Sequence, residues 1–124
     1  MRARAELDEA FNYCQKAIDI RKKLVAENPS VLDYRNDLAD SYLFLGQLEG
    51  DKGKLTESLA AQKQALLISK NLVDENPEAA DYRYVLAGHY NELALLHKKT
   101  GKYDEAMDCC EQAIAICKEL AENN

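Results

Sequence analysis

Apolar residues recur along this chain with the spacing of one buried helical face. Residues 7–25, 55–73 and 103–121 carry them at positions i, i+3, i+4 and i+7, the pattern of an amphipathic helix. Residues 38–46 and 86–94 carry a similar pattern between those segments. The chain is therefore predicted to form five helices, at residues 5–27, 30–51, 54–75, 78–99 and 102–122.

The same sequence pattern returns every 48 residues. Asn28-Pro29 returns as Asn76-Pro77, and residues 29–76 match residues 77–124 without gaps at 18 of 48 positions. Residues 1–28 continue the series one period earlier. A fixed period of this size indicates a stacked array, in which each unit buries its apolar face against its neighbours.

Glycine and asparagine separate the predicted helices. Gly53 and Gly101 are expected to adopt a left-handed conformation and to end the second and fourth helices. A residue before proline is disfavoured in helical geometry, so the first and third helices should end near Asn28 and Asn76. The proline after each asparagine suits the first turn of the next helix. Each asparagine either caps the new helix or closes the old one.

Length and charge narrow the class of protein. A chain of 124 residues suits one domain. The net charge of −6 argues against a nucleic-acid partner, because phosphate binding needs clustered Lys and Arg. No segment approaches the roughly 18 apolar residues of a membrane span, and the first residues lack the apolar run of a secretory signal. We therefore expect neither a membrane nor a nucleic acid as partner.

The cysteines indicate a reducing compartment. They are Cys14, Cys109, Cys110 and Cys117, and no two of them form a C-x-x-C pair. On one helix, Cys110 and Cys117 lie about 10 Å apart, too far for a disulfide. We interpret all four as small buried apolar side chains of a cytoplasmic protein.

The spacing of small and bulky residues resembles the tetratricopeptide repeat. Residues 90–94 read Y-x-x-L-A, residues 101–106 read G-K-Y-D-E-A, and residues 113–114 read A-I, with looser counterparts one period earlier. The family's common period is about 34 residues, so these repeats are longer. The resemblance implies an all-α, right-handed helix-turn-helix solenoid of five antiparallel helices. It would comprise a lone second-helix half-repeat at 1–28 and full repeats at 29–76 and 77–124.

The resemblance also implies a binding groove. In this family the first helix of each repeat lines a concave groove that holds an extended peptide or a partner's helix. Carried over position by position, the groove residues are Asp40, Leu43, Gln47, Asp51, Asn91, Leu95, Lys98 and Lys99. Such a mixture suits hydrogen bonds to a peptide with one or two apolar anchors. Alternatively, these residues are simply the solvated faces of two helices.

No motif points to catalysis or to a cofactor. The chain has no G-x-S-x-G sequence and no glycine-rich phosphate loop. His89 and His97 share one predicted helix without the spacing of four convergent zinc ligands. We expect no catalytic residue, no metal and no cofactor.

We interpret the chain as a non-catalytic scaffold for protein–protein interaction that binds a protein or peptide. A second hypothesis is a structural role, in which apolar stripes on the end helices pair with another copy through Phe11 and Ile114. The result would be a homo-oligomer. A third hypothesis is a regulatory segment of a larger enzyme.

Overall fold

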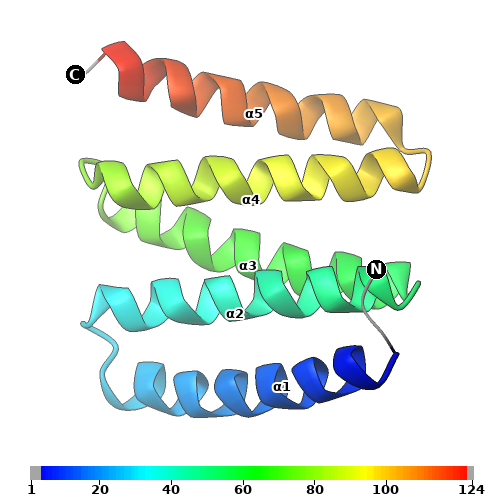
Figure 1. Ribbon diagram of the computed structural model, residues 1–124. Helices are drawn as coiled ribbons and strands as arrows, with labels where there is room; N and C mark the ends of the chain where they lie inside the picture. Colours follow the sequence, from blue (N-terminus) through cyan, green and yellow to red (C-terminus); the bar gives the residue numbers. More distant parts are fainter. Residues whose placement is uncertain (1–3, 123–124) are drawn as a thin grey trace. The chain divides into compact units, whose positions relative to one another are not determined.

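The computed structural model describes residues 4–122, and its five α-helices follow one another along the chain (Figure 1). They are α1 (Arg4–Glu27), α2 (Leu32–Asp51), α3 (Leu55–Glu75), α4 (Ala80–Lys99) and α5 (Tyr103–Glu122). The predicted all-α class and the five predicted helices are confirmed, and the helix ends fall close to the predicted residues. The predicted half-repeat 1–28 and repeat 77–124 include residues 1–3 and 123–124, which lie outside the described residues.

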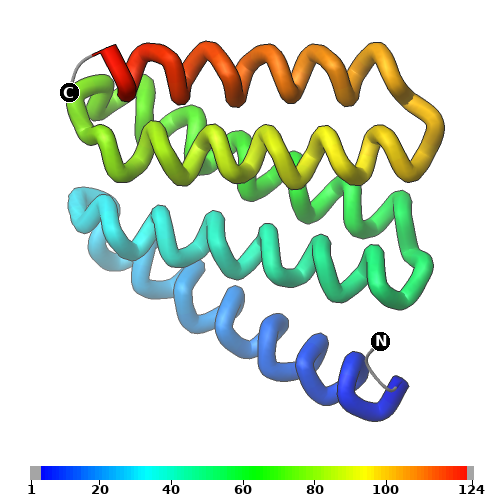
Figure 2. The backbone as a smooth tube through the Cα atoms, turned by 45° about the horizontal axis from the view of Figure 1, so that its top comes forward, coloured from blue at the N-terminus to red at the C-terminus, as the bar shows by residue number. Residues whose placement is uncertain are grey.

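The chain divides into two compact units, Met1–Ala65 and Leu66–Asn124. The first unit contains α1, α2 and the first half of α3, and the second contains the rest of α3, α4 and α5. Within the first unit, α1 and α2 lie side by side and antiparallel, as α4 and α5 do within the second (Figures 1 and 2).

Small and branched apolar side chains fill the core of each unit. In the first unit the buried apolar residues of the two paired helices are Leu7, Cys14, Ile18, Leu38, Ala39, Leu45 and Leu48. In the second unit those of α4 and α5 are Leu86, Ala87, Leu93, Ala94, Leu96, Ala106, Cys109 and Ala113. The helical periodicity of the sequence produces these buried stripes, since positions three and four residues apart share one face.

α2 and α3 approach closely in the first unit at Gly46. The Ser58 hydroxyl donates a 2.6 Å hydrogen bond to the Gly46 carbonyl oxygen. A Cβ atom placed on Gly46 would lie 2.7 Å from Gln62 Cγ and 3.1 Å from the Ser58 carbonyl oxygen. The missing side chain therefore allows this helix contact.

Gly53 and Gly101 end α2 and α4 in the left-handed region, as predicted, with φ of 79° and 78°. The next amide reaches back across each turn, because Lys54 N–H donates to the Glu49 carbonyl and Lys102 N–H to the His97 carbonyl, both at 2.8 Å. Each turn thus satisfies carbonyls that a helix end leaves without partners.

The asparagines close the old helices rather than cap the new ones. The Asn28 side-chain amide donates to the Leu24 carbonyl oxygen at 3.1 Å, and that of Asn76 to the Leu72 carbonyl oxygen at 3.1 Å. The prediction that Pro29 and Pro77 lie in the first turn of the next helix was wrong. Both lie in the turn between helices, and the next helices begin three residues later, at Leu32 and Ala80.

Two cysteines contradict the interpretation that all four are buried. Cys14 and Cys109 are buried, whereas Cys110 and Cys117 are exposed. The buried residues of α5 are Ala106, Cys109 and Ala113, and α4 packs against α5. The apolar stripe of α5 is wider than this contact, so its remaining members stay accessible to solvent.

No helix within residues 4–122 is long and apolar enough to cross a membrane.

Candidate protein-binding surface

One face of α4 combines two exposed apolar side chains with an open centre. Tyr84 is 71% exposed and Leu95 is 54% exposed. Between them on the same helical face lie Gly88 and Asn91, both exposed. A Cβ atom placed on Gly88 would meet nothing within 4 Å. We name the surface formed by Tyr84, Gly88, Asn91 and Leu95 the α4 face.

The dimensions of the α4 face suit a short extended peptide. Eleven residues separate Tyr84 from Leu95, which corresponds to about 16 Å along a helix. About five residues of an extended chain span that length. Lys98 and Lys99 follow in the last turn, and both are exposed, so the C-terminal end of this face is basic.

The structure thus leaves all four groove residues predicted in the second unit exposed on α4. Sequence reasoning missed Tyr84 and Gly88. The signal that could have found them is their spacing, because they precede Asn91 by seven and three residues.

α2 carries the other four predicted groove residues, in the first unit. Asp40, Gln47 and Asp51 are exposed, while Leu43 is half-buried. Phe44, which sequence reasoning passed over, is 41% exposed. This face of α2 is acidic, whereas the end of the α4 face is basic.

A hollow of about 270 Å³ lies between α1 and α2 in the first unit. Its lining residues are Tyr13, Cys14, Ala17, Arg21, Asp40, Ser41 and Phe44. The Arg21 guanidinium donates to the Ser41 hydroxyl and, at 3.5 Å, to the Asp37 carbonyl oxygen. Arg21 therefore ties the two helices together at this hollow.

The two residues predicted for self-association differ in their surroundings. Phe11 is half-buried, and the Lys52 ammonium lies 5.1 Å from the centre of its ring. Ile114 is 55% exposed on α5. Ile114 therefore offers much more accessible surface than Phe11.

Several buried polar groups hold the helices in place. The Ser69 hydroxyl and His89 Nδ1 form a 2.8 Å hydrogen bond between α3 and α4.

Glu49 and His97, which lie 48 residues apart, are both buried near the ends of α2 and α4. Burial, and then the Glu57 carboxylate, raise the pKa of the Glu49 carboxyl. Glu49 Oε1 is buried without a hydrogen-bond partner within residues 4–122.

The buried thiols are poor nucleophiles. Burial raises the pKa of Cys14 and of Cys109, which keeps both in the neutral thiol form at pH 7. Across the part of the chain that the structure describes, no group of three His, Cys, Asp or Glu side chains could hold a metal ion.

Comparisons with known proteins agree with this helical pattern. The family model of the tetratricopeptide repeat matches residues 1–29, 31–78 and 86–124. The chain therefore belongs to the tetratricopeptide repeat family, whose all-α solenoid class fits the five helices. Repeats of this family are non-catalytic and generally mediate protein–protein interaction.

The fold is similar to that of a solved structure. It is the crystal structure of BtubC (BKLC) from P. vanneervenii, with a TM-score of 0.69 and 21% sequence identity. The similarity covers 91% of this chain and 41% of that protein, so the chain spans less than half of its length. No curated protein sequence matches the chain significantly.

Proposed function

We propose that the chain is a protein-interaction module that binds a short peptide or a partner's helix along the α4 face, within its second full repeat. The observation that carries the proposal is the exposure of Tyr84 and Leu95 on one rigid helix, 71% and 54% respectively. Exposed apolar side chains on a helix are suitable anchors, because the backbone that carries them is already ordered before binding.

The chemistry of the α4 face suggests the kind of ligand. A ligand with two apolar side chains about 16 Å apart would cover Tyr84 and Leu95. Its backbone would cross the open surface at Gly88, where the Asn91 amide can both donate and accept hydrogen bonds. An acidic residue beyond the second anchor would lie near Lys98 and Lys99.

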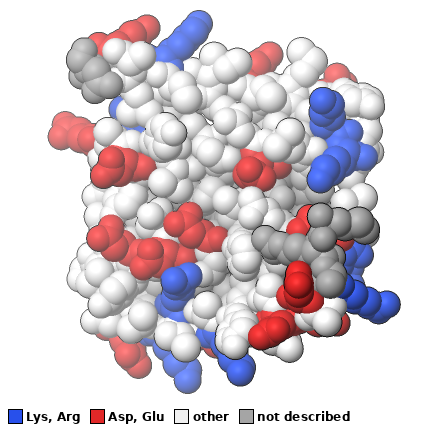
Figure 3. All heavy atoms as spheres, viewed as in Figure 1, with Lys and Arg blue, Asp and Glu red and all other residues white. Residues whose placement is uncertain are grey.

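In the first unit, the acidic face of α2 is a candidate surface of its own. There Asp40, Gln47 and Asp51 would contact polar or basic groups of a ligand, and Leu43 would contact apolar groups, while Phe44 adds aromatic surface. On the side of the molecule shown in Figure 3, charged side chains of both signs are scattered among uncharged ones. A mixed surface of this kind supports a protein partner.

The test begins with peptides selected against the whole chain from a random library displayed on phage. Binding of the selected peptides is then measured on purified variants. Leu95→Glu and Gly88→Leu should each weaken binding at least about tenfold, since one removes an anchor and the other fills the open centre. Gly88→Ala is the matched control and should bind like the wild type.

Circular dichroism must show unchanged helicity in all three variants. Equal peptide binding by Leu95→Glu, Gly88→Leu and the wild type would contradict the assignment of the ligand to the α4 face.

A further inference from the structure

α5 carries a second exposed apolar surface, which borders the α4 face at Asn91. Tyr103, Met107 and Ile114 are 64%, 61% and 55% exposed. Cys110, Cys117 and Ala121 are exposed as well. These six residues alternate at spacings of four and three, the spacing of a seam that packs along another helix. We name them the α5 stripe.

α1 shows what such a stripe contacts. Of the six α1 positions that lie 96 residues earlier, Leu7, Cys14 and Ile18 are buried, and α1 packs against α2. Near the start of α1, Asp8 pairs with Lys52 at 2.8 Å, and the same ammonium lies 5.1 Å from the centre of the Phe11 ring. Lys52 directly follows the end of α2.

The contact continues toward the end of α1. The Cys14 thiol donates a hydrogen bond to the Ser41 carbonyl oxygen at 3.3 Å. The Lys22 ammonium lies 5.8 Å from the centre of the Tyr42 ring. Four residues of α1, namely Asp8, Phe11, Cys14 and Lys22, therefore make polar or cation–π contacts with α2 or with Lys52 directly after it. Arg21 adds hydrogen bonds to the Ser41 hydroxyl and the Asp37 carbonyl oxygen.

α5 repeats three of the five α1 residues that make these contacts, and it has Cys117 at the position of Arg21. Asp104, Cys110 and Lys118 occupy the positions of Asp8, Cys14 and Lys22 and are the same residue types. Ile114 likewise occupies the position of Ile18, and Met107 that of Phe11. Nine of the 19 residues in 103–121 equal those in 7–25.

α3 shares only the lysine of this polar set, because Lys70 occupies the position of Lys22. It has Thr56 at the position of Asp8 and Gln62 at that of Cys14, and its Ser69 contacts His89 of α4 instead. The set is therefore not a general feature of the second helix of every repeat. It points to a helix with the contact residues of α2.

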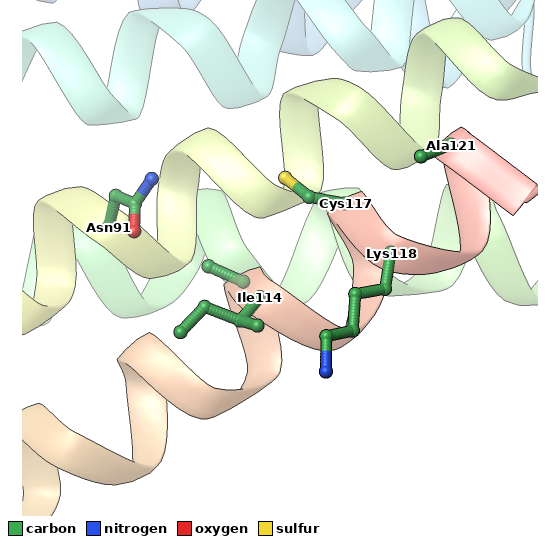
Figure 4. A pocket seen from close by; sticks show the side chains of 6 residues that line it. Asn91, Ile114, Cys117, Lys118 and Ala121 are labelled. Carbon is green, nitrogen blue, oxygen red and sulfur yellow. The ribbon is translucent and has the colours of Figure 1, made fainter.

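A hollow borders the C-terminal half of the α5 stripe. A hollow of about 330 Å³ lies between α4 and α5 and is lined by Asn91, Ala113, Ile114, Cys117, Lys118 and Ala121. Figure 4 shows the α5 side chains along one side of this hollow and Asn91 on α4. Asp104, Asp108 and Glu111 are exposed in the N-terminal half of α5, which favours a basic C-terminus on an antiparallel helix.

We infer that the α5 stripe binds an amphipathic helix of a partner that carries the contact residues of α2. A lysine at the C-terminal end of that helix pairs with Asp104, and a tyrosine ring packs beneath the Lys118 ammonium. A backbone carbonyl at its centre accepts a hydrogen bond from the Cys110 thiol. The apolar face of the helix covers Met107 and Ile114.

The probe is a fluorescein-labelled synthetic peptide with the sequence of residues 29–54 of this chain, which contains α2 and Lys52. Fluorescence anisotropy measures its binding to the full chain, and a peptide of the same composition in scrambled order is the control. Saturable binding of the labelled peptide alone is expected. Ile114→Asp should weaken it at least about tenfold. Ala115→Asp should leave it unchanged, because Ala115 lies outside the stripe and α1 already has Asp19 at that position.

A charge exchange makes the test specific. Asp104→Lys should weaken binding of the peptide, and a peptide with Lys52→Asp should bind that variant better than it binds the wild type. Circular dichroism of the Ile114, Ala115 and Asp104 variants must show the helicity of the wild type.

Three results would overturn the inference. One is equal binding by Ile114→Asp and the wild type. Another is binding that depends on Phe11 instead, because the peptide would then replace α2 on α1. The last is a concentration-dependent dimer that Ile114→Asp abolishes while the peptide fails to bind, which would assign the stripe to a second copy of this chain. Leu95→Glu should not alter peptide binding, so this inference and the proposed function on α4 fail independently.

Discussion

Replacing Gly46 with alanine should destabilise the chain, although alanine favours helix. Gly46 lies inside α2, where a new Cβ atom would lie 2.7 Å from Gln62 Cγ and 3.1 Å from the Ser58 carbonyl oxygen. Gln62 is only 6% exposed, so its side chain cannot swing into solvent. Gly88 is the matched control, because it lies inside α4 with nothing within 4 Å of the new Cβ.

Both substitutions gain the higher helix propensity of alanine, but only Gly46→Ala also introduces a steric clash. Alanine in place of glycine stabilises a helix interior by about 1 kcal/mol. Overpacking a core costs about 1–3 kcal/mol. Gly88→Ala should therefore raise the free energy of unfolding by about 1 kcal/mol, since it gains only the first effect. Gly46→Ala should lower it by about 1 kcal/mol, since the clash outweighs the gain.

The second repeat suggests how to relieve the clash. It has Ala94 at the position of Gly46 and Cys110 at that of Gln62, so a larger residue on one helix accompanies a smaller one on the other. Gly46→Ala combined with Gln62→Cys should show a favourable coupling of about 1 kcal/mol in a double-mutant cycle.

Urea unfolding followed by circular dichroism measures these free energies. The slope of the unfolding free energy against urea concentration should be the same in all variants, so that a shift of the unfolding midpoint reports a change in stability. If Gly46→Ala stabilises the chain as much as Gly88→Ala, the close contact at Gly46 is refuted.

Three further substitutions test other parts of the structure by the same unfolding measurement. Gly101→Val should destabilise the chain by about 1 kcal/mol or more, because valine is strained at positive φ; a smaller effect would contradict the left-handed turn. Ser69→Ala should cost about 1–2 kcal/mol by removing the hydrogen bond to His89, whereas an unchanged midpoint would show that this bond contributes nothing. The raised pKa of Glu49 means that the folded chain binds its proton more tightly than the unfolded chain does. The carboxyl of Glu49 therefore contributes most to the stability of the folded chain below its unfolded pKa of about 4.3. This contribution is lost as pH rises through the folded pKa. Glu49→Gln should consequently stabilise the chain more at pH 7 than at pH 4, and an equal effect at both would contradict the raised pKa.

The sequence predicted the five helices because two local signals agreed along the whole chain. Apolar spacing marked each buried stripe, and Gly53 and Gly101 stood where only a left-handed residue ends a helix cleanly. The helix starts after the prolines were less accurate. Asn28 and Asn76 use their side chains to close the preceding helix, which places the prolines in a turn.

Burial of individual side chains was harder to predict. Cys110 and Cys117 follow the apolar period of α5 but are exposed, because periodicity identifies a stripe and not the element that covers each part of it. The apolar stripe also gave no sign of Tyr84 on the α4 face, since an exposed aromatic residue lies outside the buried pattern. Contacts between helices, such as that of Ser69 with His89, depend on packing that a sequence read locally does not reveal.

The central claim is that a partner binds along the α4 face. The most direct test is a titration of the ¹⁵N-labelled chain with a peptide selected from the phage library, followed by two-dimensional NMR of the backbone amides. We expect the largest shifts at Tyr84, Gly88, Asn91, Leu95 and Lys98, with small shifts in α1. Shifts confined to α1 or to the α5 stripe, with the α4 face unchanged, would contradict it.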